Sequence, residues 1–296
     1  MDAKEKLITI YLYICDNGSI QTWLKSHRMS NNNQPEFTDE EVMTIYLYGI
    51  MQKMREKKQI YDYINEHWKD WFPKLPKYQT YNERLNRLAP AFELLVNSLI
   101  EDAHFLKDFG DVSIIDSMPI MVAKNGRSSY ARSAKEICSK GYCSSKDMYY
   151  YGLKLHMIGH KQSKTLPFPE YIKITPAHEN DLTTARPMLE KIENRVIVGD
   201  KIYADQHFNK ELKENQNTEL ITPKKKRKKQ EIRDAADELY SMAVSSIRQP
   251  IESFFNWLNE RTGIQDASKV RSTNGLLVHG LGRISVALLL LFVFNS

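Results

Sequence analysis

The sequence predicts an α/β protein in which a helical N-terminal region precedes a mixed sheet flanked by helices. Two observations predict this class. Apolar residues recur at helical spacing over roughly the first hundred positions. From residue 111 onward, short runs rich in branched and aromatic residues alternate with helical patterns. We therefore expect two domains, a helical one over residues 1–105 and a sheet-based one over residues 106–296.

Length and composition favour a soluble protein with a large core. The chain has 296 residues, of which 42% are hydrophobic, and this is enough for one large domain or two. Its opening residues are mixed in charge, unlike those of a signal peptide. The longest apolar run, residues 284–294, is shorter than the roughly 18 residues that a membrane span needs. We expect a buried terminal helix there, a cytoplasmic location, and no membrane as a partner.

The three cysteines do not indicate a disulfide framework. Cys15, Cys138 and Cys143 are few and odd in number. Cys138 and Cys143 could bind zinc, but no second Cys or His pair follows at the spacing of a zinc finger. Free thiols are therefore the default expectation.

The positive net charge comes from one segment. The chain carries +5, and six positive charges lie in a single run, so the rest of the chain is at −1. The run consists of Lys224, Lys225, Lys226, Arg227, Lys228 and Lys229. Either this run grips DNA phosphates or it is a solvated loop, and the sequence leaves both interpretations open.

Start and stop signals place helices in the first hundred residues. An apolar pattern over residues 7–15 is followed by Gly18 as a stop. Thr38 and Glu41 have the spacing of a capping box and predict the start of the next helix. A third helix, over residues 59–71, is expected to end before two prolines.

A short helix over residues 78–88 is a candidate for the recognition helix of a helix-turn-helix. Leu85 and Leu88 would face inward, leaving Arg84 and Arg87 available for DNA. The alternative is an ordinary surface helix that happens to carry basic residues.

The second half of the chain alternates between strands and helices. The expected strands are 112–115, 149–158, 171–175, 196–199 and 219–222, with helices at 181–192 and 208–214. This is the order of an RNase H-like mixed sheet. Asp181 is expected to cap its helix. Lys154 and His156 share one face of their strand, where they either contact DNA phosphate or the site, or lie on an exposed face.

Three carboxylates stand at positions that favour a metal site. Asp116 and Asp200 each end an apolar strand-like run, and Glu252 lies in a helix-like stretch. A carboxylate beside a core is costly to desolvate, so it needs a metal or a basic partner. Divalent cations prefer oxygen ligands, and a pair of them can catalyse phosphoryl transfer. For Arg248 and Glu252, an i,i+4 surface ion pair is the alternative.

In their order and spacing, these blocks resemble the DDE-type insertion-sequence transposases. Within that class the chain is most similar to the family typified by insertion sequence nine-eight-two. The blocks that carry the resemblance are residues 78–85, 114–117, 152–156, 198–203 and 248–255. Ser245 and Asn259 depart from the extended signature, where related enzymes often carry Tyr and Lys.

The resemblance implies the site residues and their roles. Asp116, Asp200 and Glu252 would bind two Mg²⁺ ions on an RNase H-like core, with Mn²⁺ as a substitute. Arg248 would hold the acidic residue or a DNA phosphate, and Tyr203 would lie near the second metal ligand. Tyr203 and Lys154 join Arg84, Arg87 and the basic run as candidate DNA contacts.

The resemblance also implies a function and partners. The expected function is that of a DNA transposase, an endonuclease that cuts the terminal inverted repeats of its element and joins the 3′-hydroxyls to target DNA. Its partners would be double-stranded DNA and further copies of itself. Two alternatives remain: a metal-dependent nuclease of the same fold without strand transfer, and a catalytically silent DNA-binding repressor.

Overall fold

The computed structural model describes residues 1–28, 35–224 and 234–294. It confirms the predicted fold class, a mixed sheet flanked by helices with an all-helical region before it. The chain forms two compact units: Met1–Leu106 together with Leu258–Ser296, and Lys107–Trp257. This division differs in one respect from the two predicted domains, because residues 258–296 pack with the helical unit.

The helical unit contains seven α-helices within the described residues. They are α1 (Ala3–Asp16), α2 (Gly18–Ser26), α3 (Asp39–Met51), α4 (Lys57–His67), α5 (Tyr78–Arg87), α6 (Ala89–Leu106) and α10 (Thr273–Leu288), which continues into the π-helical turn η4 (Leu289–Val293). The predicted capping box is confirmed. Glu41 N–H donates to Thr38 Oγ1 at 3.2 Å, and Thr38 N–H donates to the Glu41 carboxylate at 2.5 Å.

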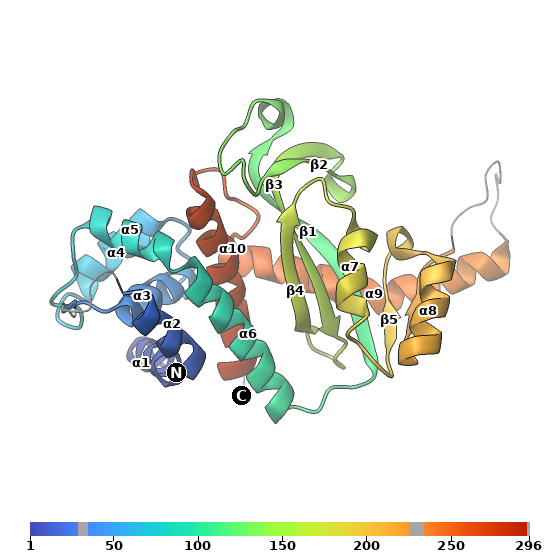
Figure 1. Cartoon of the computed structure of the whole chain (residues 1–296), viewed down its shortest axis with the longest axis horizontal. Coiled ribbons are helices and arrows are strands. Elements are labelled where there is room, and N and C mark those ends of the chain that lie inside the picture. The colour runs from blue at the N-terminus through green and yellow to red at the C-terminus, as the bar shows by residue number, and fades with distance from the viewer. Residues whose placement is uncertain (29–34, 225–233, 295–296) are drawn as a thin grey trace. The chain divides into compact units, whose positions relative to one another are not determined.

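The core of the helical unit is built from α3, α6 and α10. All residues of α3 from 42 to 50 are buried, and α10 runs alongside α6 (Figure 1). The span Thr273–Val293 is long and apolar enough to cross a membrane by length and composition, but about two thirds of its most apolar stretch is buried inside the protein. A buried core helix passes the same test, and the expectation of a buried terminal helix is confirmed.

The sheet of the second unit has six strands in the described part of the chain. They are β1 (Val112–Lys124), β2 (Ser139–Cys143), β3 (Met148–His160), β4 (Phe168–Pro176), β5 (Val196–Val198) and β6 (Glu219–Ile221). The order is β2-β3-β1-β5-β6, with β4 also paired to β3. The pairs among β1 to β4 are antiparallel, whereas β5 pairs in parallel with β1 and β6.

Two strand predictions need correction. Asp116 does not end its strand, because β1 continues through Pro119 to Lys124 and pairs with β3 along that length. In the described sheet β1 pairs with β5 only over residues 112–114, so Pro119 lies at an edge-like position, where a strand tolerates proline. The strand β2 is absent from the expected set; it is short and pairs only with β3.

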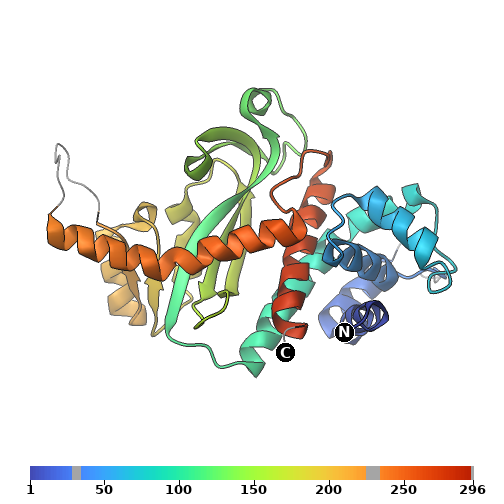
Figure 2. The ribbon, with the colours of Figure 1, turned by 180° about the vertical axis from the view of Figure 1, so that it is seen from behind.

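Helices cover both faces of this sheet. The helices α7 (Asp181–Leu189) and α8 (Gln206–Gln216) lie on one face (Figure 1), while α9 (Ala235–Thr262) crosses the other face (Figure 2). Sheet residues such as Ile115, Ile158 and Ile197 form one buried cluster with Leu189 of α7 and Phe208 of α8. This core fixes the strands that carry the aspartates.

Candidate active site

The pairing of β1 with β5 places Asp116 and Asp200 at equivalent positions. Ile114 of β1 pairs with Val198 of β5. Asp116 follows Ile114 by two residues, and Asp200 follows Val198 by two residues. Asp200 has already left β5, and its Oδ1 accepts a 2.6 Å hydrogen bond from the N–H of Lys201. Two carboxylates therefore emerge side by side from neighbouring parallel strands.

The residue before Asp200 needs to be a glycine. A Cβ on Gly199 would lie 2.9 Å from Cγ2 of Ile115 and 3.0 Å from Cδ2 of Tyr203. Both neighbours are buried in the core and have no room to move. The absence of a side chain at Gly199 therefore lets Ile115 and Tyr203 pack closely against the backbone between β5 and Asp200.

Arg248 joins the helix α9 to the sheet. Its Nη1 donates a 2.7 Å hydrogen bond to Oδ2 of Asp116, and its Nη2 donates to Oε1 of Glu252 one turn further along α9. The Arg248 side chain is only 17% exposed. The pair with Glu252 is therefore part of a three-residue bridge that reaches the sheet, rather than an isolated surface ion pair.

The three carboxylates act on one another electrostatically. Burial raises the pKa of Asp116 to about 6, while the charge of Arg248 and a hydrogen bond from the N–H of Ser117 oppose this shift. The negative charges of Asp200 and Glu252 raise the same pKa further. The charges of both other carboxylates therefore act on Asp116.

The donor set fits a divalent cation in its chemistry. Carboxylate oxygens are hard ligands, and three neighbouring carboxylates need a cation to offset their repulsion. Across residues 1–28, 35–224 and 234–294, no group of three or more His, Cys, Asp or Glu side chains is gathered closely enough to hold a metal ion. Arg248 supplies the positive charge between Asp116 and Glu252 instead. A metal bound by both carboxylates would require its guanidinium to turn away.

Lys154 belongs to a polar cluster of the sheet unit and is not a free DNA contact. Its Nζ lies 3.1 Å from Oδ1 of Asp181 and donates a 2.9 Å hydrogen bond to the carbonyl of Glu179. The lysine and the aspartate are both largely buried. The expectation that Lys154 contacts DNA phosphate is wrong, because its ammonium is needed to offset the charge of Asp181.

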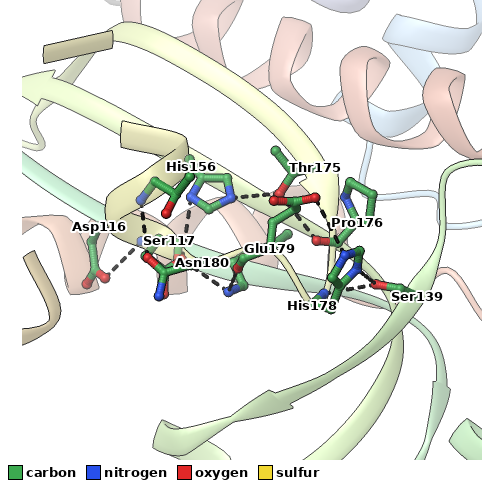
Figure 3. A network of polar contacts seen from close by, with 12 residues as sticks. Asp116, Ser117, Ser139, His156, Thr175, Pro176, His178, Glu179 and Asn180 are labelled. Atoms are coloured by element: carbon green, nitrogen blue, oxygen red, sulfur yellow. Dashed lines mark hydrogen bonds and ion pairs between the residues drawn. The ribbon is translucent and has the colours of Figure 1, made fainter. Parts of the chain in front are cut away.

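His156 completes this cluster. Its Nε2 lies 2.8 Å from Oγ1 of Thr175 and its Nδ1 3.5 Å from Oδ1 of Asp181. Burial lowers the pKa of His156 to about 4, which the charge of Asp181 opposes and that of Lys154 reinforces. The imidazole is therefore neutral at pH 7. Figure 3 shows His156 and Thr175 with Asp116 on the neighbouring strand.

Asp181 does not cap its helix. Asn180 is the N-cap of α7, and its Oδ1 accepts a 3.1 Å hydrogen bond from the N–H of Thr183. Asp181 is the first helical residue, and its side chain turns into the sheet. The sequence contained a signal for this role, because Lys154 and His156 share a strand face and require an anionic partner when that face is buried.

Tyr203 is a core residue. Its side chain is 1% exposed and packs in the cluster that contains Ile115 and Phe208. Its N–H donates a 3.0 Å hydrogen bond to the carbonyl of Asp200. The tyrosine thus lies near Asp200, as the resemblance implies, but the expectation that its side chain contacts DNA is wrong because the ring is inside the core.

The two arginines of α5 differ in their surroundings. Arg84 is held by Asp39, whose Oδ1 accepts from Nε at 3.0 Å and from Nη2 at 2.5 Å, and by the carbonyl of Phe37 at 2.7 Å. The expectation that Arg84 is available is therefore wrong. Arg87 is exposed, at the C-terminal end of the helix.

Most of the basic run lies outside the described residues. This applies to Lys225, Lys226, Arg227, Lys228 and Lys229. Lys224 is described and exposed; its N–H donates a 3.1 Å hydrogen bond to Oγ of Ser241, and its Nζ lies 5.3 Å from the centre of the Tyr240 ring.

Together, a mixed sheet with two aligned aspartates and a glutamate on an adjoining helix define an RNase H-like DDE domain. The family model described as the transposase DDE domain matches residues 107–289. The chain belongs to this family, which makes it a transposase that acts on DNA, and proteins of the family use divalent metal ions. No curated protein matches the sequence. The matched residues include all three carboxylates and Arg248.

Proposed function

We propose that the protein is the transposase of an insertion sequence of the nine-eight-two type. It binds the terminal inverted repeats of its element, cleaves the DNA at the ends, and joins the freed 3′-hydroxyls to target DNA. The observation that carries the proposal is the bridge from Arg248 to Asp116 and Glu252, beside an Asp200 whose charge acts on Asp116.

In this proposal the three carboxylates are the metal ligands. Mg²⁺ is the preferred ion because all the donors are hard oxygens, and Mn²⁺ is the natural substitute. Two such ions, when bound, activate the attacking oxygen and stabilise the leaving oxygen at phosphorus. Both cleavage by water and joining by a 3′-hydroxyl are attacks of this kind, so one site serves both steps.

Arg248 has two roles in this proposal. Before metal binding, it keeps Asp116 and Glu252 close together despite their like charges. Once the carboxylates are occupied by metal, its guanidinium becomes available for a DNA phosphate, to which Arg binds in a bidentate manner. Arg87, exposed on α5, remains the candidate for contact with the repeats.

A strand-transfer assay tests the proposed function. The substrates are a pre-cut DNA end from the sequence that flanks the gene and a supercoiled target, incubated with Mg²⁺. We expect joined products from the wild-type chain and from Glu211→Ala, an exposed carboxylate on α8 that serves as control. Cleavage without joined products would instead identify a nuclease. Specific end binding with neither product would identify a silent DNA-binding protein.

A further inference from the structure

The helical unit contains a cavity of about 460 Å³ in whose lining cationic side chains outnumber acidic ones. The first residues of α4, one face of α5, the loop over residues 266–272 and the start of α10 form its walls. The cationic lining residues are Arg55, Lys57, Lys58, Lys269, Arg271 and Arg283. Glu56 and Asp266 are the acidic residues of the lining. The lining of the cavity therefore carries a net positive charge.

Two arginines build the walls of this cavity. Arg283 is buried and donates from Nε to the carbonyl of Thr262 at 2.9 Å, from Nη1 to Oη of Tyr46 at 2.8 Å, and from Nη2 to the carbonyl of Arg55 at 2.8 Å. Arg55 donates to the carbonyls of Asn259 and Glu260 at 3.2 and 2.6 Å. These hydrogen-bond partners are neutral, and the charge of Asp266 acts on Arg55 from the same cavity.

Lys57 is the cation whose environment points most clearly to a ligand. Its Nζ donates a 2.5 Å hydrogen bond to Oδ1 of Asn86, and no carboxylate of the described residues acts on its pKa. Burial lowers the pKa of Lys57 to about 8, and the charge of Arg283 lowers it further. A partly buried ammonium with only a neutral partner gains stability when an anion binds beside it.

The start of α10 adds to the positive potential. Ser272 is its N-cap, and Oγ of Ser272 accepts a 3.1 Å hydrogen bond from the N–H of Gly275. Both residues line the cavity, so the positive end of a 16-residue helix dipole faces it. Three exposed cations, Lys58, Lys269 and Arg271, lie at the rim. Lys58 pairs with Asp62 and Lys269 with Glu56, and because both ion pairs are exposed and therefore weak, a phosphate can replace the carboxylates.

We propose that this cavity is a phosphate-binding site that holds the backbone of duplex DNA on the helical unit. One phosphate would enter beside Lys57, while Lys58, Lys269 and Arg271 would contact its neighbours along the strand. The site rests on the proposed function, which supplies DNA as the polyanion. It uses residues from both ends of the chain, because the loop before α10 packs against α4 and α5. Such contacts hold DNA without reading its sequence.

The first test is the salt dependence of binding to a short labelled duplex of random sequence, measured by fluorescence anisotropy. The rim variant is Lys58→Gln/Lys269→Gln/Arg271→Gln. The matched control is Lys4→Gln/Lys25→Gln/Lys69→Gln, which removes the same charge from exposed positions of the same unit. We expect the rim variant to lose on the order of tenfold in affinity and up to about 2.7 in log–log salt slope, about 0.9 for each phosphate contact. Equal slopes for the two variants would overturn the proposal.

The second test uses inorganic phosphate and Lys57→Met. We expect phosphate, compared with chloride at equal ionic strength, to raise the melting temperature of the wild-type chain more than that of the variant. If phosphate stabilises the wild type more than Lys57→Met, but both proteins bind DNA equally well, the cavity is a site for free phosphate. That result would overturn the DNA assignment. Should Lys57→Met fail to fold, the rim variant still decides the matter.

These results are separable from the test of the proposed function. If the wild-type chain joins DNA ends but the rim variant has the same salt slope as the control variant, the cavity proposal is rejected and the proposed function stands. If the wild-type chain joins no ends but the rim variant has a smaller salt slope than the control variant, the proposed function is rejected and the cavity proposal stands.

Discussion

The guanidinium of Arg248 on α9 donates a 2.7 Å hydrogen bond to the carboxylate of Asp116 on β1 and also binds Glu252. One cationic side chain thus stabilises two carboxylates that would otherwise repel each other. In the proposed site a divalent ion would offset the same charges and would compete with the arginine for Asp116 and Glu252. The same contacts of Arg248 therefore affect both the free energy of unfolding of the sheet unit and the binding of a metal ion.

Arg248→Ala should destabilise the chain when metal is chelated. Removing one partner of a largely buried ion pair leaves uncompensated carboxylates, and we expect a loss of about 1–3 kcal/mol in the free energy of unfolding. Mg²⁺ should then raise the melting temperature of this variant more than that of the wild type, because it replaces the missing charge. Thermal melts with EDTA and with Mg²⁺ measure both effects.

Arg186→Ala provides the control for that experiment. Arg186 forms a 2.7 Å ion pair with Asp205 that is more exposed than the pair of Arg248 with Asp116. Its loss should have a small effect that Mg²⁺ does not reverse. Equal responses of the two variants to Mg²⁺ would contradict the role given to Arg248.

Asp181→Ala should destabilise the sheet unit strongly. The substitution leaves Lys154 buried without its carboxylate and removes the acidic neighbour of His156. We expect a loss of roughly 2–4 kcal/mol in urea unfolding. Glu190→Ala, at an exposed position directly after α7, should be close to neutral. A small effect of Asp181→Ala would show that water already satisfies Lys154.

The pKa of Lys57 predicts a dependence of stability on pH. Because its pKa in the folded chain, about 8, is lower than that of an ordinary lysine near 10.4, the protonated form is disfavoured by folding. The resulting penalty is fully present below pH 8 and disappears as the pH rises toward 10.4. The other charged or titratable groups at the cavity are Tyr46, Arg55, Glu56, Lys58, Tyr78, Asp266, Lys269, Arg271, His279 and Arg283.

Comparing the wild type with Lys57→Met across this pH range isolates the effect. We expect the variant to be the more stable protein at pH 7 without phosphate, and the difference in melting temperature to shrink between pH 8 and 10. The comparison cancels most contributions from the other groups at the cavity. A difference that stays constant with pH would show that Lys57 titrates normally.

Local sequence patterns predicted much of this structure. The capping box of Thr38 and Glu41 depends on residues three positions apart, and it forms as expected. Asp116 and Asp200 could be found because each follows an apolar run, and the parallel pairing of those runs aligns the two side chains. Structural features that depend only on residues a few positions apart can be predicted from a local sequence pattern.

Features that depend on distant partners could not be predicted in the same way. Arg84 is held by Asp39, which is 45 positions away. Asp181 looks like a helix cap until β3 brings Lys154 beside it. The packing of residues 258–296 on the N-terminal helices depends on Arg283, whose partners include Tyr46 and Arg55. None of these pairings has a local signature, because the chemistry of each residue also suits an exposed position.

In the proposed function, Asp116, Asp200 and Glu252 form one metal-dependent site. The most direct test is a cleavage and joining assay on element ends for the three alanine variants, together with gel-shift measurements of end binding. We predict that each variant loses both cleavage and joining while its affinity for the ends stays close to that of the wild type, because DNA affinity comes from phosphate contacts elsewhere. Near-normal cleavage by any one of the three variants would contradict the account.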